Sequence, residues 1–190
     1  MNIDKQQLTD EQLCRQVQGG ALEAFEELVA RYKNRLLRYG RKFLLDDQQA
    51  EDSVQEVFLK AYQNIRSFNP DLKFSPWIYR IAHNEFINSG KKRGRELIDF
   101  FDFDTFLPHP ATADRADTEL EQKEIKQMID GFLDQLPDKY REPLILCYME
   151  DLDYIQMSEI LKIPVATVGV RLNRARKKLQ ELYSKSVKKI

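Results

Sequence analysis

Apolar residues recur every three or four positions along most of the chain, and the strict alternation that is typical of β-strands is nearly absent. Thr9 followed by Gln12 has the pattern of a capping box and predicts a first helix that ends near Val17, before a pair of glycines. A second helix is predicted over residues 21–44. Its expected buried side carries Phe25, Leu28, Val29, Tyr32, Leu36 and Tyr39.

A third helix is predicted to begin after Asp46 and Asp47, whose side chains can cap it. Its expected buried positions are Val54, Val57, Phe58, Ala61, Tyr62 and Ile65. The sequence Asn-Pro-Asp at 69–71 predicts a turn. Pro76 then predicts the start of a fourth helix, because proline is tolerated in the first turn. This helix is expected to end near Gly90 and to bury Trp77, Ile78, Ile81 and Ala82.

The C-terminal part of the chain has the pattern of a helix-turn-helix. Tyr154, Met157 and Leu161 give a short first helix one apolar face, and residues 162–164 interrupt the pattern. The longer helix that follows has an apolar stripe of Val168, Leu172, Ala175, Leu179 and Leu182. Its opposite face is expected to carry Thr167, Arg171, Arg174, Arg176, Lys177 and Lys178. Such a geometry fits a DNA major groove, and the alternative is an ordinary helical hairpin with a solvated basic face.

Residues 96–117 differ from the rest, because they combine aromatics, acids and two prolines without lasting periodicity. We interpret them as an extended linker. Helices resume near Thr118. The predicted fold class is therefore all-α, with two small helical bundles at 1–95 and 118–190 joined by an extended acidic linker.

Charge is strongly segregated, although the formal net charge of the 190 residues is only −1. Residues 76–95 carry five Lys or Arg against one acid, and residues 171–190 carry eight against one. Between these two basic blocks, residues 96–121 carry eight acids against one Arg. This arrangement indicates two contacts on one polyanion, separated by a segment that prefers a cationic surface.

The residue types that build metal and catalytic sites are few. Cys14 and Cys147 lack metal-ligand spacing, and only His83 and His109 could assist them, so no structural metal site or other cofactor is expected. Cys147 lies in an apolar run and is expected to be buried. Neither a signal peptide nor an apolar span of about 20 residues is evident, which favours a cytoplasmic location.

Four motifs in a fixed order carry a family resemblance. They are DDQQAEDSVQEVFLKAY, FSPWIYRIAHN, LPDKYREPLILCYMEDLDY and the helix-turn-helix, within about residues 20–182. Together they resemble bacterial RNA polymerase sigma factors of the extracytoplasmic-function (ECF) group of the sigma-70 family, which contain only sigma regions 2 and 4. The resemblance implies a transcription initiation factor without enzymatic activity. Such a factor binds core RNA polymerase, recognises the −35 and −10 promoter elements and helps to melt DNA.

The resemblance implies several macromolecular partners and no small-molecule substrate. Residues 46–62 resemble the segment that docks on the clamp helices of the largest polymerase subunit, and the flap of the second-largest subunit is a further expected contact. The docking residues would be Asp47, Glu51, Asp52, Gln55 and Glu56. Carboxylates suit an Arg-rich partner, although a solvated helix face is the simpler interpretation. An anti-sigma factor is also expected, which could hold the protein at the inner face of the membrane.

Promoter contacts are implied in both bundles. The −10 element would be opened and read by Asn69, Lys73, Phe74, Ser75, Trp77, Arg80, His83, Asn84, Asn88, Lys91, Lys92 and Arg93. The chemistry agrees, because Asn can pair with base edges and Arg and Lys with phosphates, although Trp77 has the spacing of a core residue. The −35 element would be read by Val165, Ala166, Thr167, Val170, Arg171, Asn173, Arg174 and Lys177. The linker resembles the family's connector near the RNA path, although any one of its residues could equally belong to a simple tether.

The helix-turn-helix departs from the family pattern at several positions. Lys162 occupies a turn position that is usually glycine, and Ala166 stands where a glycine is common. Gly169 and Val170 replace a common polar pair. Family rules for which base each residue reads are therefore not transferred to this chain.

Two other classes of function remain as alternatives. A stand-alone helix-turn-helix regulator would bind duplex DNA without polymerase, but it would need neither the acidic helix at 51–56 nor the loop at 69–75. An enzyme such as a nuclease would need a metal pair, a glycine-rich phosphate loop or a paired nucleophile and base, and none of these patterns occurs in the sequence.

Overall fold

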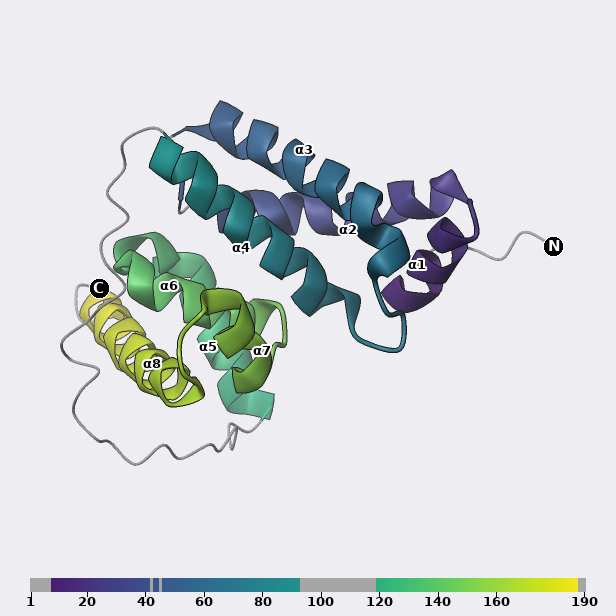
Figure 1. The fold of residues 1–190 in the computed structure, drawn as a ribbon. Coiled ribbons are helices and arrows are strands. Elements are labelled where there is room, and N and C mark those ends of the chain that lie inside the picture. The colour runs from purple at the N-terminus through teal and green to yellow at the C-terminus, as the bar shows by residue number, and fades with distance from the viewer. Residues whose placement is uncertain (1–7, 42, 45, 93–118, 188–190) are drawn as a thin grey trace. The chain divides into compact units, whose positions relative to one another are not determined.

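In the computed structural model, residues 8–41, 43–44, 46–92 and 119–187 are described. These residues form helices joined by turns, without a strand among them, which confirms the predicted all-α fold class. The chain divides into two compact units at residues 97 and 98 (Figure 1). The linker predicted at 96–117, and with it both predicted domain boundaries, lies outside the described residues.

The described residues of the N-terminal unit form four α-helices and one short turn of 3₁₀-helix. They are α1 (Asp10–Gln18), α2 (Leu22–Gly40), α3 (Asp47–Asn64), η2 (Ile65–Ser67) and α4 (Phe74–Lys92). The capping box predicted for α1 is present, since Thr9 Oγ1 accepts from Gln12 N–H and Gln12 Oε1 accepts from Thr9 N–H. Asp46 caps α3 through Gln49 N–H, as expected. α3 packs against both α2 and α4, and α1 packs on α2 (Figure 1).

The predicted buried side of α2 is largely confirmed, but the helix is shorter than expected. It ends at Gly40 instead of residue 44, and Phe43 N–H bonds to Gly40 C=O in the turn that follows. Phe43 is buried there, with its ring 5.3 Å from that of Tyr39. Val29 is only half-buried.

The predicted inner face of α4 is partly wrong. The helix begins at Phe74, so that Pro76 is its third residue and still lies in the first turn, where its missing N–H costs no helical hydrogen bond. Ile78 is fully buried as expected, whereas Trp77 and Ile81 are half-exposed. In their place Tyr79 and Phe86 are fully buried, because α4 packs against both α2 and α3 and buries a wider arc than one apolar stripe indicates. On α2, the buried ring of Tyr39 contacts the rings of both Tyr79 and Phe86.

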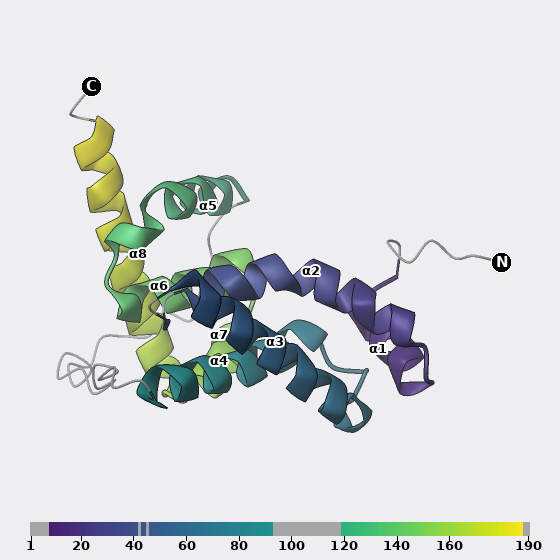
Figure 2. The same ribbon diagram turned by 90° about the horizontal axis from the view of Figure 1, so that it is seen from above.

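The C-terminal unit is a second helical bundle. Its elements are α5 (Glu119–Phe132), η4 (Leu133–Gln135), α6 (Asp138–Leu144), a π-helical stretch η5 (Ile145–Met149), α7 (Tyr154–Leu161) and α8 (Val165–Val187). α8 is the longest of these helices (Figure 2) and packs against α5, α6 and α7. Four of its five predicted stripe residues are fully buried: Val168, Leu172, Ala175 and Leu179. Leu182 is half-buried, and Cys147 in η5 is buried as predicted.

None of the described helices is long and apolar enough to cross a membrane.

Candidate nucleic-acid interface

One side of α3 is a polar surface. Asp47, Glu51, Asp52 and Gln55 are exposed and Glu56 is half-exposed, while Val54, Val57 and Phe58 on the other side are buried. We call these five polar residues the acidic face of α3. Asp47 pairs with Arg41 across 2.8 Å, and the Asp52 carboxylate accepts a hydrogen bond of 3.0 Å from Gln48. The carboxylates are thus held in defined positions and remain open to a partner.

Two apolar side chains continue the acidic face, and the sequence pattern predicts neither of them as a surface residue. Leu59 is 50% exposed and Tyr62 is 44% exposed. They follow Gln55 at spacings of four and seven residues, which puts all three on the same side of the helix. Tyr62 was expected to be buried. Its ring lies 5.1 Å from that of Phe25 at the rim of the core, which leaves the far edge of the ring in solvent.

α3 is also tied to α4 by a polar cluster on its inner side. Glu85 is 9% exposed and accepts hydrogen bonds from Lys60 Nζ and, at 2.9 Å, from Ser89 Oγ. The bond to Glu85 outweighs partial burial and raises the pKa of Lys60. Ser53 Oγ in turn bonds to Ser89 Oγ at 3.2 Å. These contacts fix the register of the two helices and therefore the position of the acidic face relative to α4.

The loop at residues 68–73 connects η2 to α4. The predicted turn is present: Asn69 Oδ1 accepts from Asp71 N–H, and Asn69 C=O accepts from Leu72 N–H, both at 3.0 Å. The tip is exposed at Asn69, Leu72 and Lys73, with Leu72 63% exposed. At its base Phe68 is buried against Phe74, with ring centroids 5.7 Å apart. The loop is therefore anchored in the core and presents a polar and apolar tip to solvent.

The structure corrects the expected exposure of Phe74 and His83. Phe74 is 1% exposed, and its ring contacts those of Tyr32 and Phe68. His83 is 2% exposed and its Nδ1 lies 2.9 Å from the Tyr39 hydroxyl. Both side chains are buried because α4 packs against two helices at once. Their arrangement supports the loop and α4 from inside.

The other residues expected at the −10 element lie at or near the surface of α4. Arg80 and Asn88 are exposed and Asn84 is half-exposed, at spacings that place all three on one side of the helix. Ser75 and Trp77 in the first turn are half-exposed, and the centroid of the Trp77 ring lies 5.1 Å from that of Phe68, with the two ring planes tilted by 46°. The side chains of Lys91 and Lys92, and all of Arg93, lie outside the described residues.

The helix-turn-helix is present as predicted, with α7 and α8 as its two helices. Asp153 caps α7 in a capping box with Gln156. Lys162 then adopts the left-handed conformation with φ 55° and ψ 40°. Ser158 stabilises the turn through two hydrogen bonds to Ile163: its hydroxyl donates to Ile163 C=O at 2.6 Å, and its own C=O accepts from Ile163 N–H. This turn fixes the angle at which α8 leaves α7.

The outer face of α8 differs from the expected cationic face. Val165, Ala166, Asn173 and Lys177 are exposed, and Val170 and Arg174 are half-exposed. Thr167 and Arg171 were expected there but are 6% and 4% exposed. At about 100° per residue they lie only about 70–110° from the centre of the buried stripe, so packing of the helix covers them. The exposed face is therefore less basic at its N-terminal end than the sequence suggested.

Gly169 lies on the side of α8 that faces α7. A Cβ at this position would lie 3.6 Å from the ring of Tyr154, an ordinary contact distance. The missing side chain at 169 therefore leaves space beside Tyr154 and removes nothing from the outer face.

Two family models match the chain, one in each unit: "Sigma-70 region 2" over residues 28–96 and "Sigma-70, region 4" over residues 126–179. The ECF RNA polymerase sigma factor SigW of Bacillus subtilis is 35% identical over 181 residues, covering 88% of this chain and 92% of the relative. The ECF RNA polymerase sigma-E factor of Escherichia coli is 30% identical over 177 residues, covering 90% and 92%. The chain belongs to the ECF sigma factors of the sigma-70 family.

Solved structures agree with this assignment. A co-crystal structure of the sigma factor RpoE with the anti-sigma factor NepR from Bartonella quintana matches at 27% identity and a TM-score of 0.58, covering 84% of this chain and 96% of that one. The structure of CnrH in complex with the cytosolic domain of CnrY matches with a TM-score of 0.61 at 24% identity, covering 93% and 97%, which shows a shared fold.

The family assignment confirms the predicted function. This sigma factor is a polymerase-binding transcription initiation factor, and none of the matched proteins supports the alternative of a stand-alone regulator. Sigma factors act as transcription initiation factors and not as enzymes. Neither the family match nor the relatives assign roles to individual residues, and those roles depend on the geometry described above.

Proposed function

We propose that the two units divide the work of promoter recognition. The N-terminal unit docks on core RNA polymerase and opens and reads the −10 element, and the C-terminal unit reads the −35 element. The observation that carries this proposal is that one small unit presents both the acidic face of α3 and, beside it on α4, a polar face that begins at the exposed 68–73 loop. A duplex-binding regulator would need neither surface.

Docking on polymerase uses the acidic face of α3 and its apolar continuation. Its carboxylates are held but solvent-accessible, so they suit the guanidinium groups of a clamp-helix partner. Leu59 and Tyr62 add apolar surface that a partner can bury. Specific protein interfaces commonly combine apolar area that becomes buried with charged residues beside it. The flap of the second-largest subunit is the proposed contact of the C-terminal unit.

Reading of the −10 element uses the 68–73 loop and the outer face of α4. The proposed contacts are Asn69, Lys73, Ser75, Trp77, Arg80, Asn84 and Asn88, followed by the basic residues Lys91, Lys92 and Arg93. Asn84 and Asn88 can hydrogen-bond base edges, while the basic residues hold the phosphates of the displaced strand. Phe74 and His83 are left out of this surface because they are buried.

Reading of the −35 element uses the outer face of α8. The proposed base contacts are Val165, Ala166, Val170 and Asn173, and the proposed phosphate contacts are Arg174 and Lys177. We expect Asn173→Ala to reduce the preference for one base at one position of the −35 element, by about 1–3 kcal/mol of binding free energy. The exposed Lys185 lies nearer the C-terminus of the helix, and Lys185→Ala should lower the affinity evenly across sequences. Selection of bound sequences from a randomised −35 library distinguishes the two effects, and an unchanged preference with Asn173→Ala would remove it from the reading face.

An anti-sigma factor is the proposed regulatory partner. The RpoE–NepR complex is a structure of that kind with a similar fold. We place the sigma factor in the cytoplasm together with RNA polymerase, and a membrane-anchored anti-sigma factor would hold it at the inner face of the membrane.

Run-off transcription with core polymerase on a library of randomised promoters tests the proposed function. We expect transcripts from a subset of promoters that share sequence near −35 and −10, and none from core polymerase alone. A gel shift without polymerase is the control. Tight, specific binding to duplex DNA by the free protein, together with no promoter-dependent transcription, would instead support a stand-alone regulator.

A further inference from the structure

α1 contacts the 68–73 loop and its two ends through a row of polar side chains. Glu11, Arg15 and Gln18 follow one another at spacings of four and three residues, so they lie on one side of α1. The apolar side of α1, with Leu13 and Cys14 fully buried, packs on α2. One side of the helix is thus fixed to the core, and an adjacent side holds the loop.

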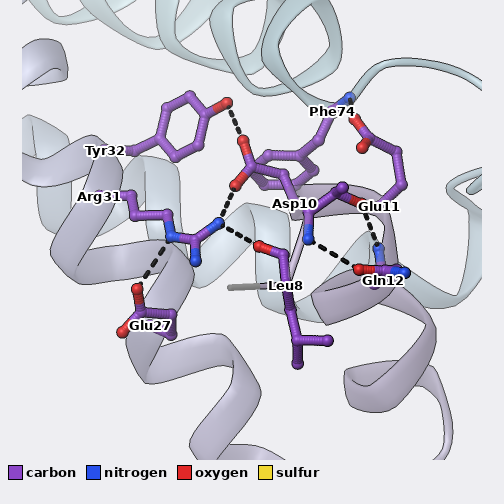
Figure 3. Close-up of polar contacts among 9 residues, drawn as sticks. Leu8, Asp10, Glu11, Gln12, Glu27, Arg31, Tyr32 and Phe74 are labelled. Carbon is purple, nitrogen blue, oxygen red and sulfur yellow. Dashed lines mark hydrogen bonds and ion pairs between the residues drawn. The ribbon is translucent and has the colours of Figure 1, made fainter. Parts of the chain in front are cut away.

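Each of the three side chains bonds to a different part of the loop segment. The Glu11 carboxylate accepts from Phe74 N–H at 3.0 Å, where α4 begins (Figure 3). Arg15 Nη2 lies 2.6 Å from Asp71 Oδ1 at the tip. Gln18 Nε2 donates to two backbone carbonyls, Ile65 and Phe68, both at 2.8 Å. α1 therefore contacts the start of the loop, its tip and the first residue of α4.

Gln18 is the side chain of these three that makes two partly buried hydrogen bonds to the loop segment. Its amide is partly buried and satisfies two carbonyls on either side of the 3₁₀ turn, so its removal leaves both of them without that donor. The Arg15–Asp71 pair is different, because its side chains are 59% and 77% exposed and solvent weakens such a pair.

α1 is itself held by a partly buried polar network around Asp10 (Figure 3). Asp10 accepts from Arg31 Nη1 at 2.8 Å and from the Tyr32 hydroxyl at 2.6 Å. Arg31 also donates to Leu8 C=O and to Glu27, both at 2.9 Å. Burial and the hydrogen bond to Asp10 raise the pKa of Tyr32 above its ordinary range, so the hydroxyl remains a donor. The network connects α2 to α1 at the end from which Glu11 reaches α4.

We propose that α1 is the positioning element of the −10 reading loop, with Gln18 as its principal positioning residue. This inference rests on the proposed role of the 68–73 loop and α4 at the −10 element. α1 precedes the residues that match the sigma region 2 model, which begin at residue 28. Gln18 acts through the backbone of the loop and does not itself touch DNA. Its loss should therefore reduce discrimination among −10 sequences more than it reduces binding to polymerase.

The test compares Gln18→Met with Gln16→Met in holoenzyme reconstituted from core polymerase and the full chain. Methionine has a similar length but no N–H donor. Gln16 lies on the same helix and its side chain is exposed, so it controls for the loss of a glutamine from α1. The probe is a promoter library randomised at the −10 element. The readouts are the ratio of preferred to average sequences among open complexes, and the affinity for core polymerase.

We expect Gln18→Met to lower the −10 preference ratio by about fivefold, which corresponds to the loss of about one net hydrogen bond. Core affinity should stay unchanged, and Gln16→Met should match the unaltered protein in both readouts. An unchanged preference ratio with Gln18→Met would overturn the inference. If Gln18→Met does not fold, Arg15→Ala takes its place, since this exposed side chain is not needed for the core. It should shift the ratio in the same direction by a smaller factor, and no shift would again overturn the inference.

Asn84→Ala separates failure of this inference from failure of the proposed function. If Asn84→Ala changes the −10 preference and Gln18→Met does not, the reading surface stands and the positioning role of α1 is wrong. If neither variant changes the preference or strand opening in permanganate footprinting, the proposed −10 surface is wrong, and the inference fails with it.

Discussion

Lys162 carries a conformational cost that glycine would relieve. Its φ of 55° and ψ of 40° lie in the left-handed region, at the C-terminal cap of α7. For an L-residue this conformation costs about 1–2 kcal/mol. Glycine avoids the cost but loses about 0.5–1 kcal/mol more backbone entropy on folding. The difference is about 0–1.5 kcal/mol, so that Lys162→Gly is predicted to stabilise the C-terminal unit by about 0.75 kcal/mol, the middle of this range.

Urea denaturation of the full chain measures this effect with a control inside the molecule. Trp77 is the only tryptophan of the chain and lies in the N-terminal unit, so its fluorescence reports unfolding of that unit. Far-UV circular dichroism reports helix loss in both units. Lys162→Gly should raise the urea midpoint of the circular dichroism transition that belongs to the C-terminal unit and leave the fluorescence midpoint unchanged.

Lys162→Ala is the matched control variant. It removes the same exposed side chain but keeps a Cβ in the left-handed conformation. It should therefore be no more stable than the unaltered protein. Equal stability of Lys162→Gly and Lys162→Ala would refute the reasoning, because backbone conformation would then not determine the stability of the turn.

Three further predictions concern the N-terminal unit. Reversing the charge of Asp52 and Glu56 on the acidic face should reduce the free energy of binding to core polymerase by about 1.5–3 kcal/mol for each desolvated contact. Undiminished binding in a pull-down would contradict the proposed docking face. Gly40→Ala should lower the free energy of unfolding by about 1–3 kcal/mol, because the new Cβ would lie 3.0 Å from the fully buried ring of Phe86. This steric cost should exceed the gain from the better helix propensity of alanine, and a more stable variant in urea denaturation would show that the ring can move. Burial raises the pKa of the Cys14 thiol from 9.0 to about 12, so the contribution of this neutral thiol to the free energy of unfolding is complete below pH 9 and should be lost as the pH rises toward 12. The urea midpoint of Cys14→Ala should lack this decrease, and the same pH dependence in both proteins would contradict the prediction.

Features that depend on neighbours in the sequence could be predicted well. The capping box at Thr9, the Asp46 cap and the turn at residues 69–71 are each determined by residues within three positions of one another. The buried stripe of α8 is likewise a periodic pattern, and four of its five residues are fully buried. Local propensity and helical periodicity were sufficient at these positions.

Features that depend on a second helix could not be predicted. Periodicity gives the direction of a buried face but not its width, which is set by how many helices pack around it. His83 is buried because Tyr39 of α2 lies opposite it, 44 residues away in sequence. Arg171 is buried for a related reason, beside the stripe of α8. The contacts of Gln18 to the loop join residues 47 and 50 positions apart, and no local pattern indicates them.

The burial of Thr167 and Arg171 affects the proposed recognition of DNA by α8. With these two side chains covered, the exposed N-terminal part of the helix offers Val165, Ala166 and Val170, which are small and apolar. Apolar contacts of this kind distinguish thymine by its methyl group, while Asn173 can pair with adenine. The cationic residues lie further along the helix, where they attract phosphates without regard to sequence. The sequence preference of this sigma factor at −35 is therefore expected to be directed at A·T pairs and to depend little on arginine–guanine contacts. A binding-site selection with the intact protein that returns a guanine-rich −35 element, lost with Arg174→Ala, would contradict this expectation.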